Sequence, residues 1–322
     1  MDATQKEIDE RSGLTANSKF ELMLFRLGIS PHSDTSEVYG INVFKLRELM
    51  AMPTVNSIAN SPPHVMGMAN IRGQLIPVIN LPAVLGCTPN TGLNILMVTE
   101  FSGSTQAFAV EEVDEIVRLN WNQVRAAEGA ATGGGTITSI AQLDTDINNT
   151  RLAQVLDVEQ ILRTAMPSDI PDVNLQTLGE TPAIADGAVV LAADDSGSAR
   201  MLISNCLESM GLPFDMAKTG QEAWLRLCAL YDEAEKENKS IRSKVALVLT
   251  DLEMPEMDGF TLTRKIKADP RFRNIPVVIH SSLSGSTNES HVKSVGADAY
   301  TAKFKADELA ATLLDVLNKS RQ

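Results

Sequence analysis

The chain has 322 residues, of which 43% are hydrophobic and 21% charged, a balance that is typical of a folded globular protein and excludes wholesale disorder. Its length predicts two domains, since domains usually have roughly 100–200 residues. The net charge of −13 argues against nucleic-acid binding, because an acidic surface repels phosphate groups. No apolar run approaches the roughly 18 residues of a membrane-spanning helix, and the polar N-terminus has no signal core. Three cysteines without metal-ligand spacing suit a reducing cytoplasm, so we expect a cytoplasmic protein without membrane insertion.

The first part of the chain reads as β-structure. A polar tail covers residues 1–17, and residues 18–165 contain short apolar segments interrupted by glycine, proline and asparagine. Several short strands at close spacing favour a sandwich or a pair of small barrels. We expect strands at 20–26, 38–43, 65–70, 75–79, 95–99, 107–110, 113–119 and 152–156, and short helices at 43–50 and 158–164.

Two glycine- or proline-rich segments interrupt this pattern. The run Gly133-Gly134-Gly135 lacks the Gly-Lys-Ser/Thr that follows in a phosphate-binding loop, so it favours a flexible hairpin loop. Residues 166–186 contain three prolines and no sustained periodicity, which predicts a linker between two domains.

Residues 187–322 alternate strand and helix. This alternation predicts a doubly wound, five-stranded parallel sheet, in which ligands bind at the carboxyl ends of the strands. We expect strands at 189–192, 214–217, 245–249, 277–279 and 299–301, and helices at 198–210, 221–238, 259–267, 289–295 and 307–318.

Charged and hydroxyl side chains follow four of these strands. Asp194 and Asp195 follow the first strand, Asp251 the third, Ser281 the fourth and Lys303 the fifth. A single aspartate after a strand is usually a turn former, but three carboxylates and a lysine at matching strand ends favour a functional site. Because neighbouring carboxylates repel one another, the set predicts a bound Mg²⁺. One carboxylate, Asp251, could then attack a phosphoryl group whose oxygens Mg²⁺, Lys303 and Ser281 would neutralise.

These residues lie in segments that resemble response-regulator receiver domains. The resemblance covers about residues 187–322 and is carried by Ala193–Ser196, Thr250–Gly259, Ile275–Ser282, Gly296–Tyr300 and Lys303. It implies that a histidine kinase phosphorylates Asp251, and that Asp195, Asp251 and the backbone carbonyl of Glu253 bind Mg²⁺ with help from Asp194 through water. It also implies a switch pair formed by Ser281 and Tyr300.

The sequence departs from the receiver pattern at two positions. Lys303 is followed by Phe304 rather than by proline, so a cis-proline turn is not expected there. Glu253 places a bulky acid two residues after Asp251, where it would border the path of a hydrolytic water. We therefore expect Glu253 to change the lifetime of a phosphoryl group on Asp251.

The first domain resembles CheW-type coupling domains over about residues 18–164. The resemblance is carried by 25–28, 38–43, 47–50, 108–116, 156–162 and, most specifically, by the central motif 70–81. It implies two small five-stranded barrels that share a core. A coupling domain followed by a receiver is the arrangement of CheV-type chemotaxis proteins, whose partners are chemoreceptors and a histidine kinase in membrane receptor arrays.

One arginine in the central motif has two interpretations. Arg72 lies between Asn70 and Gly73 in a predicted hairpin turn beside apolar strands. It is either a solvated turn residue or a partner contact, because arginine is enriched at interfaces.

The sequence thus favours a non-enzymatic signalling adaptor over two alternatives. A Mg²⁺-dependent phosphatase with an aspartyl-phosphate intermediate could use Glu253 as its proton donor. A two-component transcription regulator would need a DNA-binding domain, and we expect none after the receiver because the chain ends at Gln322, shortly past the last predicted helix.

Overall fold

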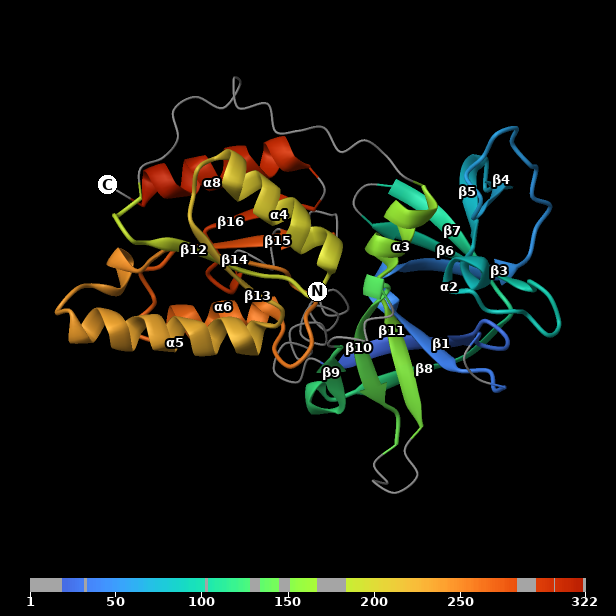
Figure 1. Ribbon diagram of the computed structural model, residues 1–322, viewed down its shortest axis with the longest axis horizontal. Coiled ribbons are helices and arrows are strands. Elements are labelled where there is room, and N and C mark those ends of the chain that lie inside the picture. The colour runs from blue at the N-terminus through green and yellow to red at the C-terminus, as the bar shows by residue number, and fades with distance from the viewer. Residues whose placement is uncertain are drawn as a thin grey trace, which may run out of the picture.

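The computed structural model describes residues 19–31, 34–101, 104–127, 134–144, 151–166, 184–282, 294–303 and 305–320. Figure 1 shows a β-rich N-terminal domain beside a C-terminal α/β domain. The expected tail at 1–17, Gly133, most of the linker and most of the helix at 289–295 lie outside the described residues.

The first sheet of the N-terminal domain has six strands in the order β8-β1-β2-β11-β10-β9. The pairing of β2 with β11 is parallel, and the other pairings are antiparallel. Its strands are β1 (Phe20–Arg26), β2 (Val38–Asn42), β8 (Glu112–Leu119), β9 (Val124–Ala126), β10 (Ile137–Gln142) and β11 (Leu152–Leu156).

The second sheet has five strands in the order β3-β6-β7-β5-β4. Side-chain hydrogen bonds draw its outer parts together: Arg47 donates to Gln74 at 3.3 Å, and Arg72 donates to Glu48 at 2.7 Å. The strands are β3 (Leu46–Ala51), β4 (Val65–Ile71), β5 (Gln74–Asn80), β6 (Ile95–Phe101) and β7 (Ser104–Val110).

The helix expected at 43–50 is wrong. Asn42 caps only a single 3₁₀ turn, η1 (Val43–Lys45), and β3 follows directly. Burial alternates along β3 as it pairs with β6, so the half-buried sheet surface overrides the local helical pattern. The first sheet also has six strands where five were expected, because the three-residue strand β9 extends its edge.

The two sheets share an apolar core. Phe25 and Phe108 are fully buried, and they pack with Ile79 and with Ile161 from α3 (Val158–Ala165). A short helix, α2 (Leu81–Leu85), also contributes to this core and was not expected from the sequence. The N-terminal domain is therefore a β-structure with α3 packed on its core, consistent with the expected all-β class.

The C-terminal sheet is entirely parallel, with strand order β13-β12-β14-β15-β16. The expected five strands are confirmed, with bounds within a few residues. They are β12 (Val189–Ala193), β13 (Phe214–Ala217), β14 (Val245–Thr250), β15 (Val277–Ser281) and β16 (Ala299–Ala302).

Helices cover both faces of this sheet, as the doubly wound fold requires. One apolar cluster joins the sheet to α4 (Gly197–Ser209) and α8 (Ala306–Lys319), and another joins it to α5 (Gly220–Lys236) and α6 (Gly259–Ala268). Every residue of β14 is buried, as expected of a central strand.

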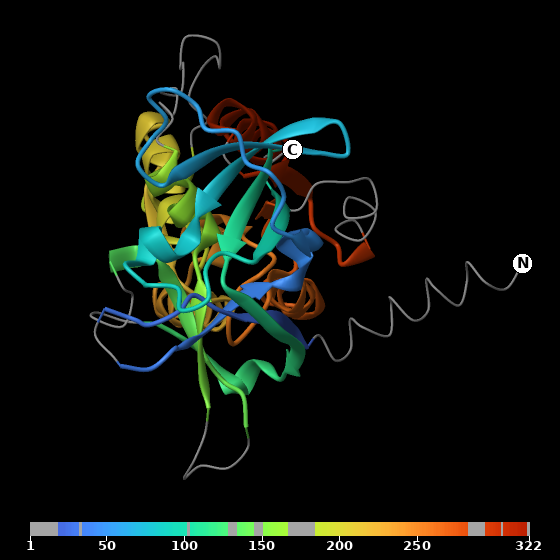
Figure 2. The ribbon, with the colours of Figure 1, turned by 90° about the vertical axis from the view of Figure 1, so that its right-hand side faces the viewer.

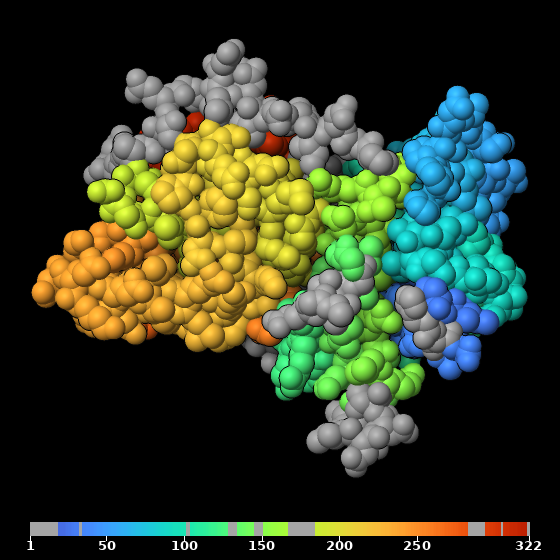
Figure 3. Space-filling model, viewed as in Figure 1, coloured from blue at the N-terminus to red at the C-terminus, as the bar shows by residue number. Residues whose placement is uncertain are grey.

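The two domains contact each other where α3 meets α4. They abut in the space-filling view (Figure 3), and the view from the N-terminal side shows the C-terminal helices behind the β-strands (Figure 2). Among the described residues, no helix has both the length and the apolar character needed to cross a bilayer.

Candidate functional site

The three predicted carboxylates lie together at the carboxyl edge of the C-terminal sheet. Asp194 and Asp195 follow β12, and Asp251 follows β14. The turn after β12 is fixed by hydrogen bonds: the Ser196 amide donates to Asp194 Oδ1 at 3.0 Å, and Arg200 donates to the carbonyls of Asp194 and Asp195 at 2.8 Å. One oxygen from each carboxylate lies within 4.8 Å of the others.

Lys303 joins this cluster from the end of β16. Its Nζ lies 2.9 Å from Asp251 Oδ2 and 3.0 Å from Asp194 Oδ2. The side chain is only 1% exposed, so these ion pairs lie away from bulk water. The sequence prediction that Asp194, Asp251 and Lys303 converge is therefore confirmed by their positions.

The pKa values show how crowded the site is with negative charge. Burial and the neighbouring Asp251 raise the pKa of Asp195 to about 7. Burial also raises the pKa of Asp194 and of Asp251, although Lys303 opposes both shifts. Burial alone would lower the pKa of Lys303, but Asp194 and Asp251 raise it well above its ordinary value. Lys303 is therefore a permanent cation in the site.

The carboxylate cluster fits a divalent cation. Mg²⁺ prefers oxygen ligands and is usually held by one or two carboxylates together with water. A cation would reverse the pKa shift that burial and repulsion impose on Asp195. Asp194, Asp195 and Asp251, three of the four residues that the sequence assigned to Mg²⁺, are close enough together to share one ion.

Glu253 has an unusual environment. Among the described residues neither of its carboxylate oxygens has a hydrogen-bond partner, and both are shielded from solvent. Burial and Asp251 raise the pKa of Glu253 to about 7 although Lys45 opposes the shift. The charge of Glu253 is therefore affected by both Asp251 and Lys45.

The two predicted switch residues lie on neighbouring strands. Ser281 ends β15 and is buried, and its carbonyl accepts the Lys303 amide at 2.9 Å. Tyr300 lies in β16, half-buried against Leu252 and Ile279. Ser281 thus lies on the strand next to β14, and Tyr300 lies on the edge strand beyond it.

Two residues of the N-terminal domain reach this site. Glu159, in the first turn of α3, places Oε2 at 3.6 Å from Lys303 Nζ and Oε1 at 3.3 Å from Lys45 Nζ. The Glu159 side chain is 0% exposed and that of Lys45 is 16% exposed. Burial would raise the pKa of Glu159, but Lys303 and Lys45 together lower it to about 2. Glu159 is therefore an anion held between two cations from different domains.

No motif or spacing in the sequence predicts that Lys45 and Glu159 belong to the site. Lys45 lies in the segment 43–50, for which the sequence pattern predicts a helix. Glu159 lies in a short amphipathic helix, where a glutamate is an ordinary surface residue. Asp157 caps α3, and so fixes the start of the helix that carries Glu159, by accepting the Gln160 amide at 2.9 Å.

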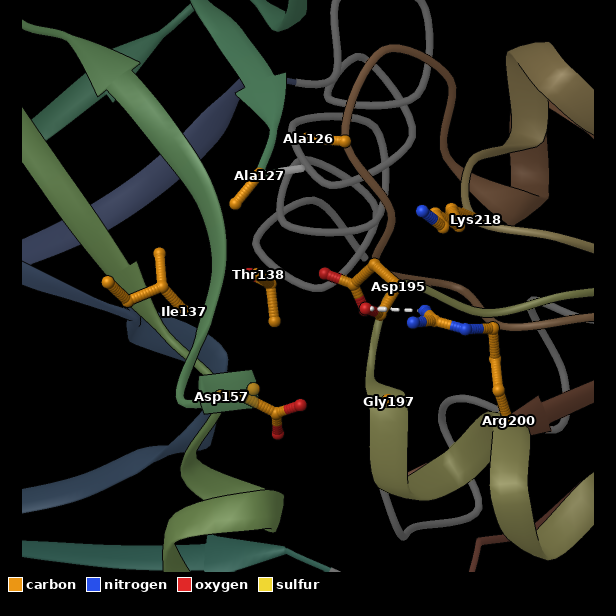
Figure 4. A pocket seen from close by; sticks show the side chains of 10 residues that line it. Ala126, Ala127, Ile137, Thr138, Asp157, Asp195, Gly197, Arg200 and Lys218 are labelled. Carbon is orange, nitrogen blue, oxygen red and sulfur yellow. Dashed lines mark hydrogen bonds between the residues drawn. The ribbon is translucent and has the colours of Figure 1, made fainter. Parts of the chain in front are cut away.

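A pocket lies between the domains beside the acidic cluster (Figure 4). Asp157 and Thr138 line it from the N-terminal domain, and Asp195, Arg200 and Lys218 line it from the C-terminal domain. In Figure 4 the carboxylates of Asp157 and Asp195 both point into the space between the domains.

Arg72 belongs to the other domain, where it lies in the turn between β4 and β5. Its φ of 50° is in the left-handed region, and its side chain is 75% exposed. The ion pair with Glu48 lowers the pKa of that carboxyl. Leu75, the second residue of β5, is 68% exposed.

The comparisons with known proteins cover both domains. Residues 21–166 match the family described as the CheW-like domain, and residues 190–314 match the response regulator receiver domain. Three chemotaxis proteins of Helicobacter pylori (strain ATCC 700392 / 26695) match over most of their length.

Chemotaxis protein CheV3 is 29% identical over 307 residues, covering 94% of this chain and 96% of that protein. CheV2 is 28% identical over 330 residues, covering 97% and 99%. CheV1 is 30% identical over 325 residues, covering 94% of each. With both domains matched in order and a relative of this identity spanned almost end to end, the chain belongs to the CheV family of chemotaxis coupling proteins, in which a CheW-like domain precedes a receiver.

Proposed function

We propose that Asp251 accepts a phosphoryl group from a histidine kinase, and that this modification regulates a cytoplasmic adaptor linking the kinase to chemoreceptors. The observation that carries the proposal is the convergence of Asp194, Asp195, Asp251 and Lys303 at one sheet edge. A purely structural turn would not require three carboxylates around one buried ammonium.

The transfer step follows from the contacts of Asp251. A carboxylate oxygen of Asp251 attacks phosphorus, the new O–P bond forms, and the P–N bond of the kinase phosphohistidine breaks. The imidazole retains the electron pair of the broken bond. Leu252 holds Asp251 in place because its amide donates to Oδ1 at 2.7 Å.

Charge stabilisation comes from both sides of the acceptor. Lys303 is 2.9 Å from Asp251 and would pair with phosphoryl oxygens as negative charge develops. We propose that Mg²⁺ binds Asp195, Asp251 and the backbone carbonyl of Glu253, with Asp194 acting through water. When bound, the ion supplies the remaining positive charge.

Ser281 and Tyr300 complete the proposed response to phosphorylation. Ser281 lies at the end of the strand next to β14 and would hydrogen-bond a phosphoryl oxygen. Tyr300 lies one strand further out. It would shift when Ser281 moves to make this hydrogen bond, and it would carry the change to the surface of the receiver.

We propose that the coupling domain contacts its partners through the turn that contains Arg72. An exposed arginine beside the exposed Leu75 offers both a charge and an apolar contact, the combination enriched at protein interfaces. Receptor arrays at the membrane would thereby recruit the protein without membrane insertion.

Phosphotransfer from a labelled histidine kinase tests the acceptor. We expect label on wild type in the presence of Mg²⁺ and none on Asp251→Asn, since an amide is a poor nucleophile. Asp307→Asn is a matched control, because Asp307 is an exposed acid of the same domain. Equal labelling of Asp251→Asn and the control would assign phosphorylation to another residue.

Turnover of small phosphate esters tests the phosphatase alternative. We expect no turnover above that of Asp251→Asn, because Glu253 should block the water that would release phosphate from Asp251. Sustained release of phosphate by wild type would contradict the adaptor proposal.

A further inference from the structure

The coupling domain occupies space next to the phosphoacceptor. Lys303 Nζ is surrounded by carboxylates from Asp251 at 2.9 Å, Asp194 at 3.0 Å and Glu159 at 3.6 Å. An ammonium group has three N–H donors, so these three carboxylates leave Lys303 no donor to spare for a further anion. Lys303 holds Glu159 most weakly of the three, since Nζ donates hydrogen bonds to Asp251 at 2.9 Å and to Asp194 at 3.2 Å, while Glu159 Oε2 accepts none from the described residues.

A phosphoryl group on Asp251 would compete with Glu159 for the same cation. Phosphorylation replaces a carboxylate of one negative charge with a group of about two and adds acceptor oxygens. Those oxygens need Lys303, while Glu159 is fully buried beside them. Two anionic groups that share one buried ammonium repel each other, and only Glu159 is free to leave, because it belongs to a separate domain.

Polar contacts join the domains at α3 and α4. Arg163 of α3 donates to the carbonyl of Ser198 in α4 at 3.4 Å, which is a long hydrogen bond. Among the described residues, each apolar core cluster belongs to one domain alone, so the contact between α3 and α4 would open without uncovering a shared apolar core.

We propose that Glu159 is an intramolecular lock, which holds the coupling domain over the receiver site until phosphorylation of Asp251 displaces it. The closed form restricts access of the phosphodonor to Asp251, and the phosphorylated form has separated domains. The inference rests on the proposed function of Asp251 as phosphoacceptor. It assigns Glu159 and Lys45, which lie outside the receiver, to the regulation of that site.

The test uses the full-length protein with acetyl phosphate and Mg²⁺ and measures two independent quantities. The radius of gyration by small-angle X-ray scattering reports domain separation, and intact mass reports phosphorylation. We expect the radius of gyration to increase when wild type is phosphorylated and to stay constant for Asp251→Asn under the same conditions.

Variants of the lock give the second measurement. Glu159→Gln removes the charge with little change in shape, and we expect it to accept phosphate about threefold or more faster than wild type. Arg163→Ala loosens the same contact away from Lys303 and should act in the same direction, even if Glu159→Gln destabilises α3. Glu115→Gln is the matched control, an exposed glutamate of the same domain, and should leave the rate unchanged.

The outcomes separate the lock from the function on which it rests. Phosphorylation of Asp251 without an increase in the radius of gyration would overturn the lock and leave the phosphoacceptor intact. Equal rates for Glu159→Gln, Arg163→Ala and Glu115→Gln would do the same. No phosphorylation in any variant, by either acetyl phosphate or kinase, would overturn both proposals.

Discussion

Gly259 gives a sharp test of how the phosphoacceptor is positioned. It is the first residue of α6, directly after the cap Asp258, and its amide donates to the Leu252 carbonyl at 2.9 Å. A Cβ added to Gly259 would lie 1.9 Å from the backbone carbonyl oxygen of Asp251. The glycine therefore allows α6 to start against the segment that carries the acceptor.

The size of the effect follows from that distance. Ordinary contacts of a Cβ begin at 3.4 Å, so Gly259→Ala requires a displacement of about 1.5 Å between α6 and Asp251. A misplacement of about 1 Å at a reacting group can reduce a rate by about 100-fold. We therefore expect phosphate acceptance by Gly259→Ala to fall by about two orders of magnitude.

The free energy of unfolding of Gly259→Ala provides a second test, because two effects of opposite sign act on it. Helix propensity alone predicts that alanine stabilises a helix by about 0.5–1 kcal/mol relative to glycine. The clash acts in the opposite direction, because overpacking of this kind costs about 1–3 kcal/mol. The net change in the free energy of unfolding should be a loss of up to about 2.5 kcal/mol.

Two measurements check this prediction: the rate of phosphorylation by acetyl phosphate and urea unfolding of the receiver. Gly197→Ala is the control, since Gly197 also begins a helix but its added Cβ would meet nothing nearer than 3.8 Å. If Gly259→Ala accepts phosphate at the wild-type rate and gains stability as Gly197→Ala should, the positioning argument fails.

Three further substitutions probe other parts of the molecule. Arg72→Glu should weaken binding to receptor–kinase arrays about tenfold or more in sedimentation assays without altering phosphorylation; unchanged binding would make Arg72 only a solvated turn residue. Glu253→Ala should speed decay of the labelled protein several-fold, because we expect this buried acid to border the path of the hydrolytic water, and slower decay would instead identify Glu253 as a base. Burial lowers the pKa of His280 to about 3, so the unfolded chain takes up a proton near pH 6.5 before the folded chain does. Stability should therefore fall as pH decreases from about 6.5 toward 3, and His280→Leu should lose that contribution in urea titrations at several pH values; an unchanged pH dependence would refute it.

The receiver could be predicted from the sequence almost element by element. Its strands are apolar runs such as Val245–Thr250, whose burial on both faces leaves little ambiguity. The carboxylates follow those strands directly, so the topology alone brings Asp194, Asp195 and Asp251 to one edge. Local pattern and global fold agree in this domain, so the spacing of these residues along the chain was sufficient to predict that they meet.

The fold of the coupling domain is harder to predict from the sequence because its strands are short and irregular. Leu46–Ala51 carries good helix formers, yet pairing with β6 makes it a strand. Only the tertiary partner resolves this conflict. The strands β9 and β10 were obscured similarly, since the former has three residues and the latter follows a glycine-rich segment.

Contacts between domains produce no periodic pattern in a sequence, so they cannot be predicted as helices and strands can. Lys45 and Glu159 are examples. Each is a common surface residue type, and together they add no net charge to the receiver site. Docking depends on the position of Glu159 between Lys45 and Lys303. Such a contact is sensitive to one added anion at Asp251, because the exposed fractions of 0% for Glu159 and 1% for Lys303 leave little water to screen it. A buried ion-pair contact of this kind suits a domain that separates in response to a single phosphoryl group.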